Sequence, residues 1–223
     1  MIEKPRHHFS IQLSAAVWNV LPVPGRPWVV VEERDESNRK VSFSAIDYLK
    51  KETVWRNDSL PELWWINLVR LTPEQVLLKI FENTSNPDVT HWLALSVADG
   101  KPLDQAIETE GEHTNDLIQP FQYLAGEHDF ETVKQFIEGR TQKLPLLGAE
   151  YLEHAGFIFI SFYFGNPGTF SNELACFTKT GNLLWQEEIG TNLKGIGVNT
   201  FFVVSDYLFF VKNKSELVTF RIV

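Results

Sequence analysis

An eleven-residue pattern that begins with alanine and ends with tryptophan recurs along the chain, and it constrains the fold more than any other feature. The two full copies are AIDYLKKETVW, from Ala45 to Trp55, and ACFTKTGNLLW, from Ala175 to Trp185. A third copy, ALSVADGKPLD, begins at Ala94 and has Asp104 where tryptophan is expected. Repetition of this kind predicts a fold built from stacked supersecondary units.

Each copy has the chemistry of a β-hairpin with one bulky anchor. An apolar strand leads into a polar turn, where a glycine such as Gly100 or Gly181 tolerates the positive φ of a tight turn. The returning strand carries a tryptophan that we expect to pack on a neighbouring unit, because one hairpin cannot bury its own face. The predicted structural anchors of the repeat are Trp18, Ala45, Trp55, Ala94, Gly100, Ala175, Gly181 and Trp185.

Similar apolar strands and polar turns precede each copy, so units can be assigned along the whole chain. The prediction is one domain, residues 1–223, with units at about 21–60, 61–108, 146–190 and 191–223 and a degenerate unit at 109–145. Five units is the preferred count. The segment DFETVKQFIEGR also fits a short helix, with Asp129 as N-cap and Phe130, Val133 and Ile137 at helical spacing. Four units plus an insertion is therefore the alternative.

The two ends of the chain are predicted to complete each other. The segment ELVTFRIV ends the sequence as a strand, and FSIQLSAAVWNV, near its beginning, has no hairpin partner of its own. Pairing residues 9–20 with the C-terminal strand would remove exposed strand edges. Trp18 would then hold in the last unit the place that Trp55 and Trp185 hold in theirs.

The pattern Ala-x-Asp-x-x-Thr-Gly-x-x-x-Trp resembles the repeat of quinoprotein-like β-propellers. Asp47 fits it in the first copy, where Lys50 and Lys51 replace Thr-Gly, and Thr180 and Gly181 fit it in the last, where Phe177 replaces Asp. The resemblance implies an all-β, small, five-bladed propeller of an uncharacterised, domain-of-unknown-function kind. It does not extend to the residues that bind a quinone, so no cofactor is predicted.

The composition of the chain disfavours some classes of partner and favours one cellular compartment. With 17 Phe and 7 Trp the chain favours strands, and its net charge of −9 disfavours nucleic acid and anionic membrane surfaces as partners. The longest apolar run is too short to span a bilayer as a helix. Cys176 is the only cysteine, which favours a reducing compartment and a cytoplasmic location. In its strand context this thiol is expected to be buried and inert.

Few residues suggest a functional site. The adjacent Trp64 and Trp65 should point to opposite faces of a strand, which makes one of them a candidate contact for a ligand or partner. The histidines lack metal-binding spacing, and the acidic cluster 108–116 is interpreted as a solvated loop, so no metal is predicted. No catalytic residue is identified.

Two functions remain open at this point. The first is a non-catalytic binding or scaffold module that uses the loops or channel of a propeller to hold a protein or a small molecule. The second is a carbohydrate-active hydrolase, because five-bladed propellers include glycosidases with carboxylates at the channel. Asp47 is one acid that could serve there.

Overall fold

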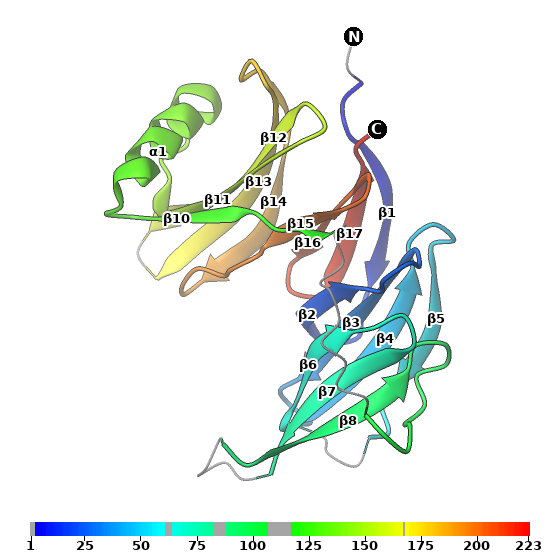
Figure 1. The fold of residues 1–223 in the computed structure, drawn as a ribbon. Coiled ribbons are helices and arrows are strands. Elements are labelled where there is room, and N and C mark those ends of the chain that lie inside the picture. The colour runs from blue at the N-terminus through cyan, green and yellow to red at the C-terminus, as the bar shows by residue number, and fades with distance from the viewer. Residues whose placement is uncertain (1–2, 61–63, 83–87, 107–116, 167) are drawn as a thin grey trace. The chain divides into compact units, whose positions relative to one another are not determined.

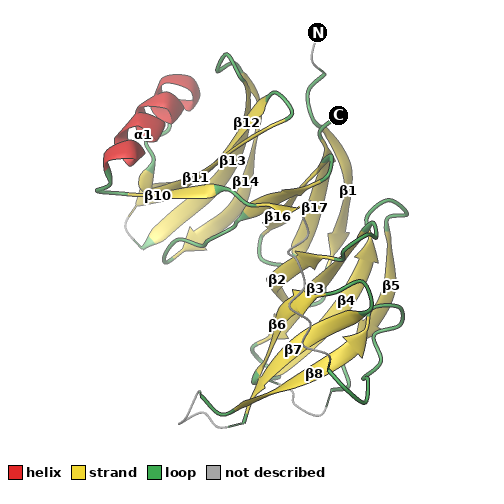
Figure 2. Ribbon diagram, viewed as in Figure 1, coloured by secondary structure: helices red, strands yellow, loops and turns green. Residues whose placement is uncertain are grey.

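The computed structural model describes residues 3–60, 64–82, 88–106, 117–166 and 168–223, and these form mostly antiparallel strands with one helix (Figures 1 and 2). The chain divides into two compact units. Residues 12–115 make up one, called here the central unit, and residues 1–11 with 116–223 make up the other, called the terminal unit. The mainly β prediction is confirmed.

The central unit contains two sheets in which each strand pairs with the next along the chain. The first sheet has the order β2 (Ala16–Pro22), β3 (Trp28–Asp35), β4 (Lys40–Asp47) and β5 (Glu52–Asn57). The second consists of β6 (Ile66–Leu71), β7 (Gln75–Phe81) and β8 (Thr90–Ser96). Alternate apolar residues of both sheets form a shared core that includes Phe43, Trp55, Ile66 and Leu78.

The terminal unit also contains two sheets, together with the helix. One sheet has the order β10 (Phe121–Leu124), β11 (Leu146–His154), β12 (Phe157–Asn166), β13 (Thr169–Thr178) and β14 (Leu183–Leu193). The other has the order β1 (Arg6–Gln12), β17 (Glu216–Arg221), β16 (Tyr207–Lys212), β15 (Phe201–Val204) and β9 (Leu117–Ile118). The helix α1 (His128–Thr141) buries Phe130 and Ile137 against the sheet that begins with β10.

The prediction that the two ends of the chain pair is confirmed for β1 and β17, which are neighbours in one sheet. The pairing covers less of the N-terminal segment than expected, because β1 ends at Gln12 and residues 16–22 form β2 in another sheet. Trp18 is 64% exposed in β2. The prediction that Trp18 is an anchor of the last unit is therefore wrong.

The stretch predicted as a degenerate unit does not form a sheet of its own among its described residues, 117–145. Its strands β9 and β10 are edge strands of two different sheets, and α1 follows them (Figure 1). The helix alternative is confirmed, although the N-cap is Glu127 and not Asp129. The described residues thus form four antiparallel sheets and one helix, and the number of repeat units stays a prediction.

The turns of the repeat share a residue with positive φ at the equivalent position. Gly100 has φ +70° and Gly181 has φ +83°, and in the first copy Lys51 takes the equivalent place with φ +64°. A non-glycine residue at positive φ is strained, which explains why glycine is found in the other two copies. The hydrogen bonds of the turn differ, because the amides of Lys51 and Gly100 donate to the carbonyl four residues back, whereas the amide of Gly181 donates to that of Thr178, three residues back.

The anchors of the repeat lie at contacts between sheets within each unit. In the central unit the indole of Trp55 packs on Gly100, and its Nε1 donates a hydrogen bond to the carbonyl of Val97 at 2.7 Å. In the terminal unit Trp185 stacks on Phe220 of β17, with 4.9 Å between ring centroids. Ala45, Ala94 and Ala175 are all buried in their strands, and Ala45 pairs with Trp55.

Candidate functional site

Arg34, near the end of β3, is the centre of the most unusual group of side chains in the central unit. Its Nε donates to the carboxylate of Glu32 at 2.7 Å. The remaining guanidinium nitrogens donate to the carbonyls of Trp64, at 3.2 Å, and Ile66, at 2.7 Å, and to the side-chain oxygen of Asn67. These bonds use the edge of the guanidinium and leave its two faces for stacking.

Two indoles lie against this guanidinium. The guanidinium carbon of Arg34 lies 4.9 Å from the ring centroid of Trp18 and 5.4 Å from that of Trp64. Arg39, in the β3–β4 turn, lies 5.7 Å from the Trp64 ring. Tryptophan and arginine therefore alternate in a chain of contacts, Trp18–Arg34–Trp64–Arg39, which we call the Trp–Arg ladder. All three distances fall within the range of cation–π attraction.

A β-bulge sets the position of Trp18 at one end of the Trp–Arg ladder. Val17 pairs with Glu33 and Asn19 pairs with Glu32, so Trp18 has no partner across the strand pair. A bulge of this kind re-aims one side chain and interrupts the alternation of the strand. Asn19 then donates to the carbonyl of Leu68 at 3.0 Å, which ties the bulged strand to β6.

The β3–β4 turn sets the position of Arg39 at the other end. Asp35 accepts hydrogen bonds from the side chain and the backbone amide of Asn38, and these bonds lower the pKa of the Asp35 carboxyl. The charged carboxylate fixes the turn in the manner of an Asx motif. Arg39 follows with φ +48°.

Glu32 supplies the negative charge that the buried part of the ladder requires. Its side chain is fully buried, pairs with Arg34 and accepts a hydrogen bond from the amide of Leu68 at 2.7 Å. Burial raises the pKa of this carboxyl, while the Leu68 amide and Arg34 act in the opposite direction. Because a buried charge is tolerated only when paired, Glu32 and Arg34 depend on each other.

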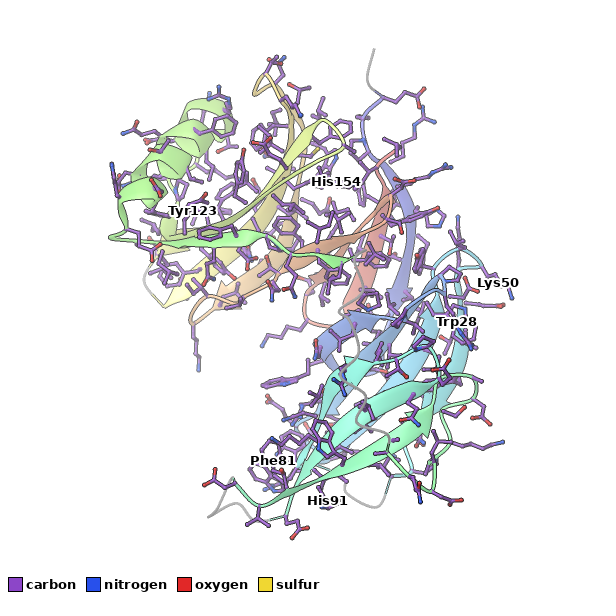
Figure 3. The ribbon with its side chains drawn as sticks, viewed as in Figure 1. Trp28, Lys50, Phe81, His91, Tyr123 and His154 are labelled. Atoms are coloured by element: carbon purple, nitrogen blue, oxygen red, sulfur yellow. The ribbon has the colours of Figure 1, made fainter. Side chains whose placement is uncertain are left out.

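The structure separates the two tryptophans that the sequence singled out. Trp64 belongs to the Trp–Arg ladder, whereas Trp65 is 42% exposed and its carbonyl accepts from the amide of Phe81 at 2.9 Å. Phe81 and His91 lie at one end of the central unit, and Trp28, at the beginning of β3, lies at the other (Figure 3). Arg34, at the far end of β3 from Trp28, was not identified from sequence. The acidic and basic residues Glu32, Glu33 and Arg34 inside an apolar strand were the available signal.

Asp47, the acid considered for catalysis, is held by structural contacts, and so is the buried Glu33. Asp47 accepts from the indole of Trp28 at 3.0 Å and from the turn amides of Leu49 and Lys50 at 3.0 and 2.9 Å. Glu33 is fully buried and pairs with Arg56, and it also accepts from Ser14. These carboxylates stabilise a turn and a strand junction, respectively.

Two further predictions concern metal binding and the thiol. The acidic cluster 108–116 lies outside the described residues. Among the residues that are described, no group of three or more histidine, cysteine or acidic side chains is arranged to hold a metal ion. Cys176 is buried in β13, and burial raises its pKa to about 12, which keeps the thiol protonated at neutral pH.

A second buried polar group lies in the terminal unit. Glu150 of β11 accepts from the amides of Asn199 and Thr200 and from the Thr200 hydroxyl, whose oxygen lies 2.8 Å from the hydroxyl oxygen of Ser161. Burial raises the pKa of the Glu150 carboxyl. The group fastens the chain before β15 to the neighbouring sheet, and its polar atoms are occupied by one another.

Comparison with known proteins gives one partial match. Residues 24–103, within the central unit, match the model of a domain of unknown function, DUF4905. No curated protein matches the chain. In the described part of the chain no helix is long and apolar enough to cross a membrane. The matched stretch contains Arg34, Arg39 and Trp64, and Trp18 lies just before it.

Proposed function

We propose that this protein is a non-catalytic binding module and that it holds a protein partner on the Trp–Arg ladder of the central unit. The observation that carries the proposal is the exposure of Trp18, whose side chain is large and apolar and whose surface is 64% exposed. Its ring stacks on the guanidinium of Arg34, which four hydrogen bonds hold in place. Tryptophan and arginine are the residues most enriched where binding energy concentrates in protein interfaces. A side chain that is already fixed loses little entropy on binding.

Further exposed apolar side chains extend this surface. Val69 of β6 is 44% exposed and follows Leu68, whose carbonyl is bonded to Asn19 beside Trp18. Folding alone does not require a large indole at an exposed bulge, because its burial contributes little. Contact with a partner supplies a physical reason for Trp18.

The architecture that we propose for this module is a small β-propeller. Each of the four sheets contains strands that pair consecutively along the chain, and the repeat turns have a residue with positive φ at the same position. The Trp55–Gly100 contact between consecutive repeats supports the resemblance to quinoprotein-like repeats. A crystal structure with the sheets arranged around a common axis would test this architecture; sheets without such an axis would reject it.

Photo-crosslinking in the cells that produce the protein tests the binding function. A photoreactive phenylalanine at Val69 should crosslink to a partner, and adding Trp18→Ala should abolish that product. The matched control places the same group at Leu49, which is 50% exposed and lies in the β4–β5 turn. Products that form equally with and without Trp18 would rule out the Trp–Arg ladder as the binding surface.

A further inference from the structure

The contacts of the Trp–Arg ladder alternate between indole and guanidinium groups, and at one end the alternation stops at the exposed indole of Trp18. The order is indole, guanidinium, indole, guanidinium, beginning at Trp18 and ending at Arg39. One face of the Trp18 ring is covered by Arg34, and 64% of the residue is exposed. The next group that would continue the alternation beyond Trp18 is a cation.

The electrostatics of an indole face favour that same group. The face of an aromatic ring carries the negative part of its quadrupole, so it attracts ammonium and guanidinium groups. Arg34 on the inner face does not oppose this, because its charge is balanced by the fully buried carboxylate of Glu32 at 2.7 Å. A cation that approaches the exposed face of Trp18 is therefore not repelled by an isolated positive charge, because the charge of Arg34 is paired with Glu32.

The charge of the whole chain acts in the same direction. Its formal net charge is −9, which attracts a basic partner over long range and repels an acidic one. Arginine suits the site better than lysine, because its planar guanidinium stacks on an aromatic face. An acidic partner would be confined to the Arg39 end.

We infer that the exposed face of Trp18 receives an arginine side chain from a basic segment of the partner protein, so that a third guanidinium extends the Trp–Arg ladder. This inference rests on the proposed function and specifies the chemistry of the partner. It assigns Arg34 and Glu32 a positioning role, since they hold the Trp18 ring, while Trp18 itself makes the contact.

Fluorine NMR of the full chain, labelled with 5-fluorotryptophan, tests the inference. The Trp18 resonance is assigned from its loss in Trp18→Phe. The probes are synthetic peptides of alternating arginine and glycine, the same peptide with each arginine replaced by neutral, nearly isosteric citrulline, and an alternating glutamate–glycine peptide. The arginine peptide should shift the Trp18 resonance saturably, and the other two should not.

Two variants separate contact at Trp18 from general attraction to an acidic surface. Trp18→Ala should weaken binding of the arginine peptide about 2- to 5-fold, the range of a single exposed cation–π contact. Leu49→Ala, at an exposed apolar residue in the β4–β5 turn, should leave the affinity unchanged.

Each remaining outcome overturns the inference in a recognisable way. Equal affinity for the citrulline peptide would mean that stacking and not charge is recognised, and equal affinity of Trp18→Ala would mean that the acidic surface alone attracts the peptide. A response to the glutamate peptide would indicate an acidic partner. All three leave the crosslinking result standing, whereas loss of Trp18-dependent crosslinking removes the proposed function itself.

Discussion

The two units use the same repeat hairpin but fill its turn glycine with different side chains. In the central unit Gly100 is covered by Trp55 from the preceding repeat. In the terminal unit the covering group comes from α1, where the guanidinium of Arg140 covers Gly181 and donates to its carbonyl at 2.8 Å. A planar group from a helix thus occupies the place of a planar group from a strand.

The difference shows which part of the repeat contact is essential. In the two copies that have a glycine at this position, a flat group packs against it, and both an indole and a guanidinium provide one. The guanidinium carbon of Arg140 also lies 3.9 Å from the ring centroid of Phe136, so the arginine is itself held by stacking. A side chain from a helix therefore covers the turn glycine of the terminal unit, where a side chain from a strand covers that of the central unit.

The largest expected effect is the loss of an anchor tryptophan. Trp55→Ala removes a buried ring and its hydrogen bond to Val97, and it should lower the free energy of unfolding by about 3–5 kcal/mol. Trp185 is only partly buried, and its buried Nε1 has no hydrogen-bond partner, so Trp185→Ala should cost about 2–3 kcal/mol. Urea denaturation measures both; a larger loss at Trp185 would contradict the comparison.

The next effect distinguishes the two glycines. In Gly100→Ala the new Cβ would lie 2.7 Å from Cδ2 of Trp55, a ring that is packed in the core. In Gly181→Ala it would lie 2.7 Å from Nε of Arg140, on a flexible side chain that can withdraw. Both substitutions carry about 1–2 kcal/mol of strain from positive φ. Thermal unfolding should show the greater loss for Gly100→Ala, and equal losses would mean that Trp55 moves as freely as Arg140.

A smaller effect is expected at Arg140 itself. Arg140→Ala removes the hydrogen bond to Gly181 and should lower stability by about 1 kcal/mol. Arg140→Lys retains the charge but not the planar group and should recover little of that loss. Urea denaturation of both variants checks this, and full recovery by lysine would show that charge and not stacking is what Gly181 requires.

The pH dependence of stability has a defined sign in the terminal unit. Burial raises the pKa of Glu150 above its ordinary value of 4.5, so the folded protein binds this proton more tightly than the unfolded chain. The associated stability is complete below pH 4.5 and is lost as the pH rises through the raised pKa. Glu150→Gln should flatten this part of the profile of unfolding free energy against pH. An unchanged profile would exclude Glu150 as its source.

The smallest effect on stability is expected at Trp18. Because this side chain is largely exposed, Trp18→Ala should change the free energy of unfolding by no more than about 0.5 kcal/mol. The contrast with Trp55, measured under the same conditions, separates a tryptophan that binds from one that folds the chain. A loss at Trp18 comparable to that at Trp55 would place it in the core after all.

Local sequence determined the hairpins and their turns. Apolar alternation, the turn glycines and the tryptophan that ends each repeat are properties of neighbouring residues, and they predicted the mainly β fold, the repeat and the pairing of the chain's ends. The spacing of Phe130 and Ile137 likewise predicted the helix, as an alternative to a repeat unit. These local patterns predict strands, turns and helices without any knowledge of which sheets pack against each other.

Only the tertiary structure decided the role of Trp18 and the existence of the Trp–Arg ladder. Trp18, Arg34 and Trp64 lie on three segments that no common spacing connects, and Trp18 was expected in the wrong sheet. The physical reason is the bulge in β2: one unpaired residue interrupts the alternation of the strand, so the direction of a side chain is fixed by register with β3 and not by its own sequence.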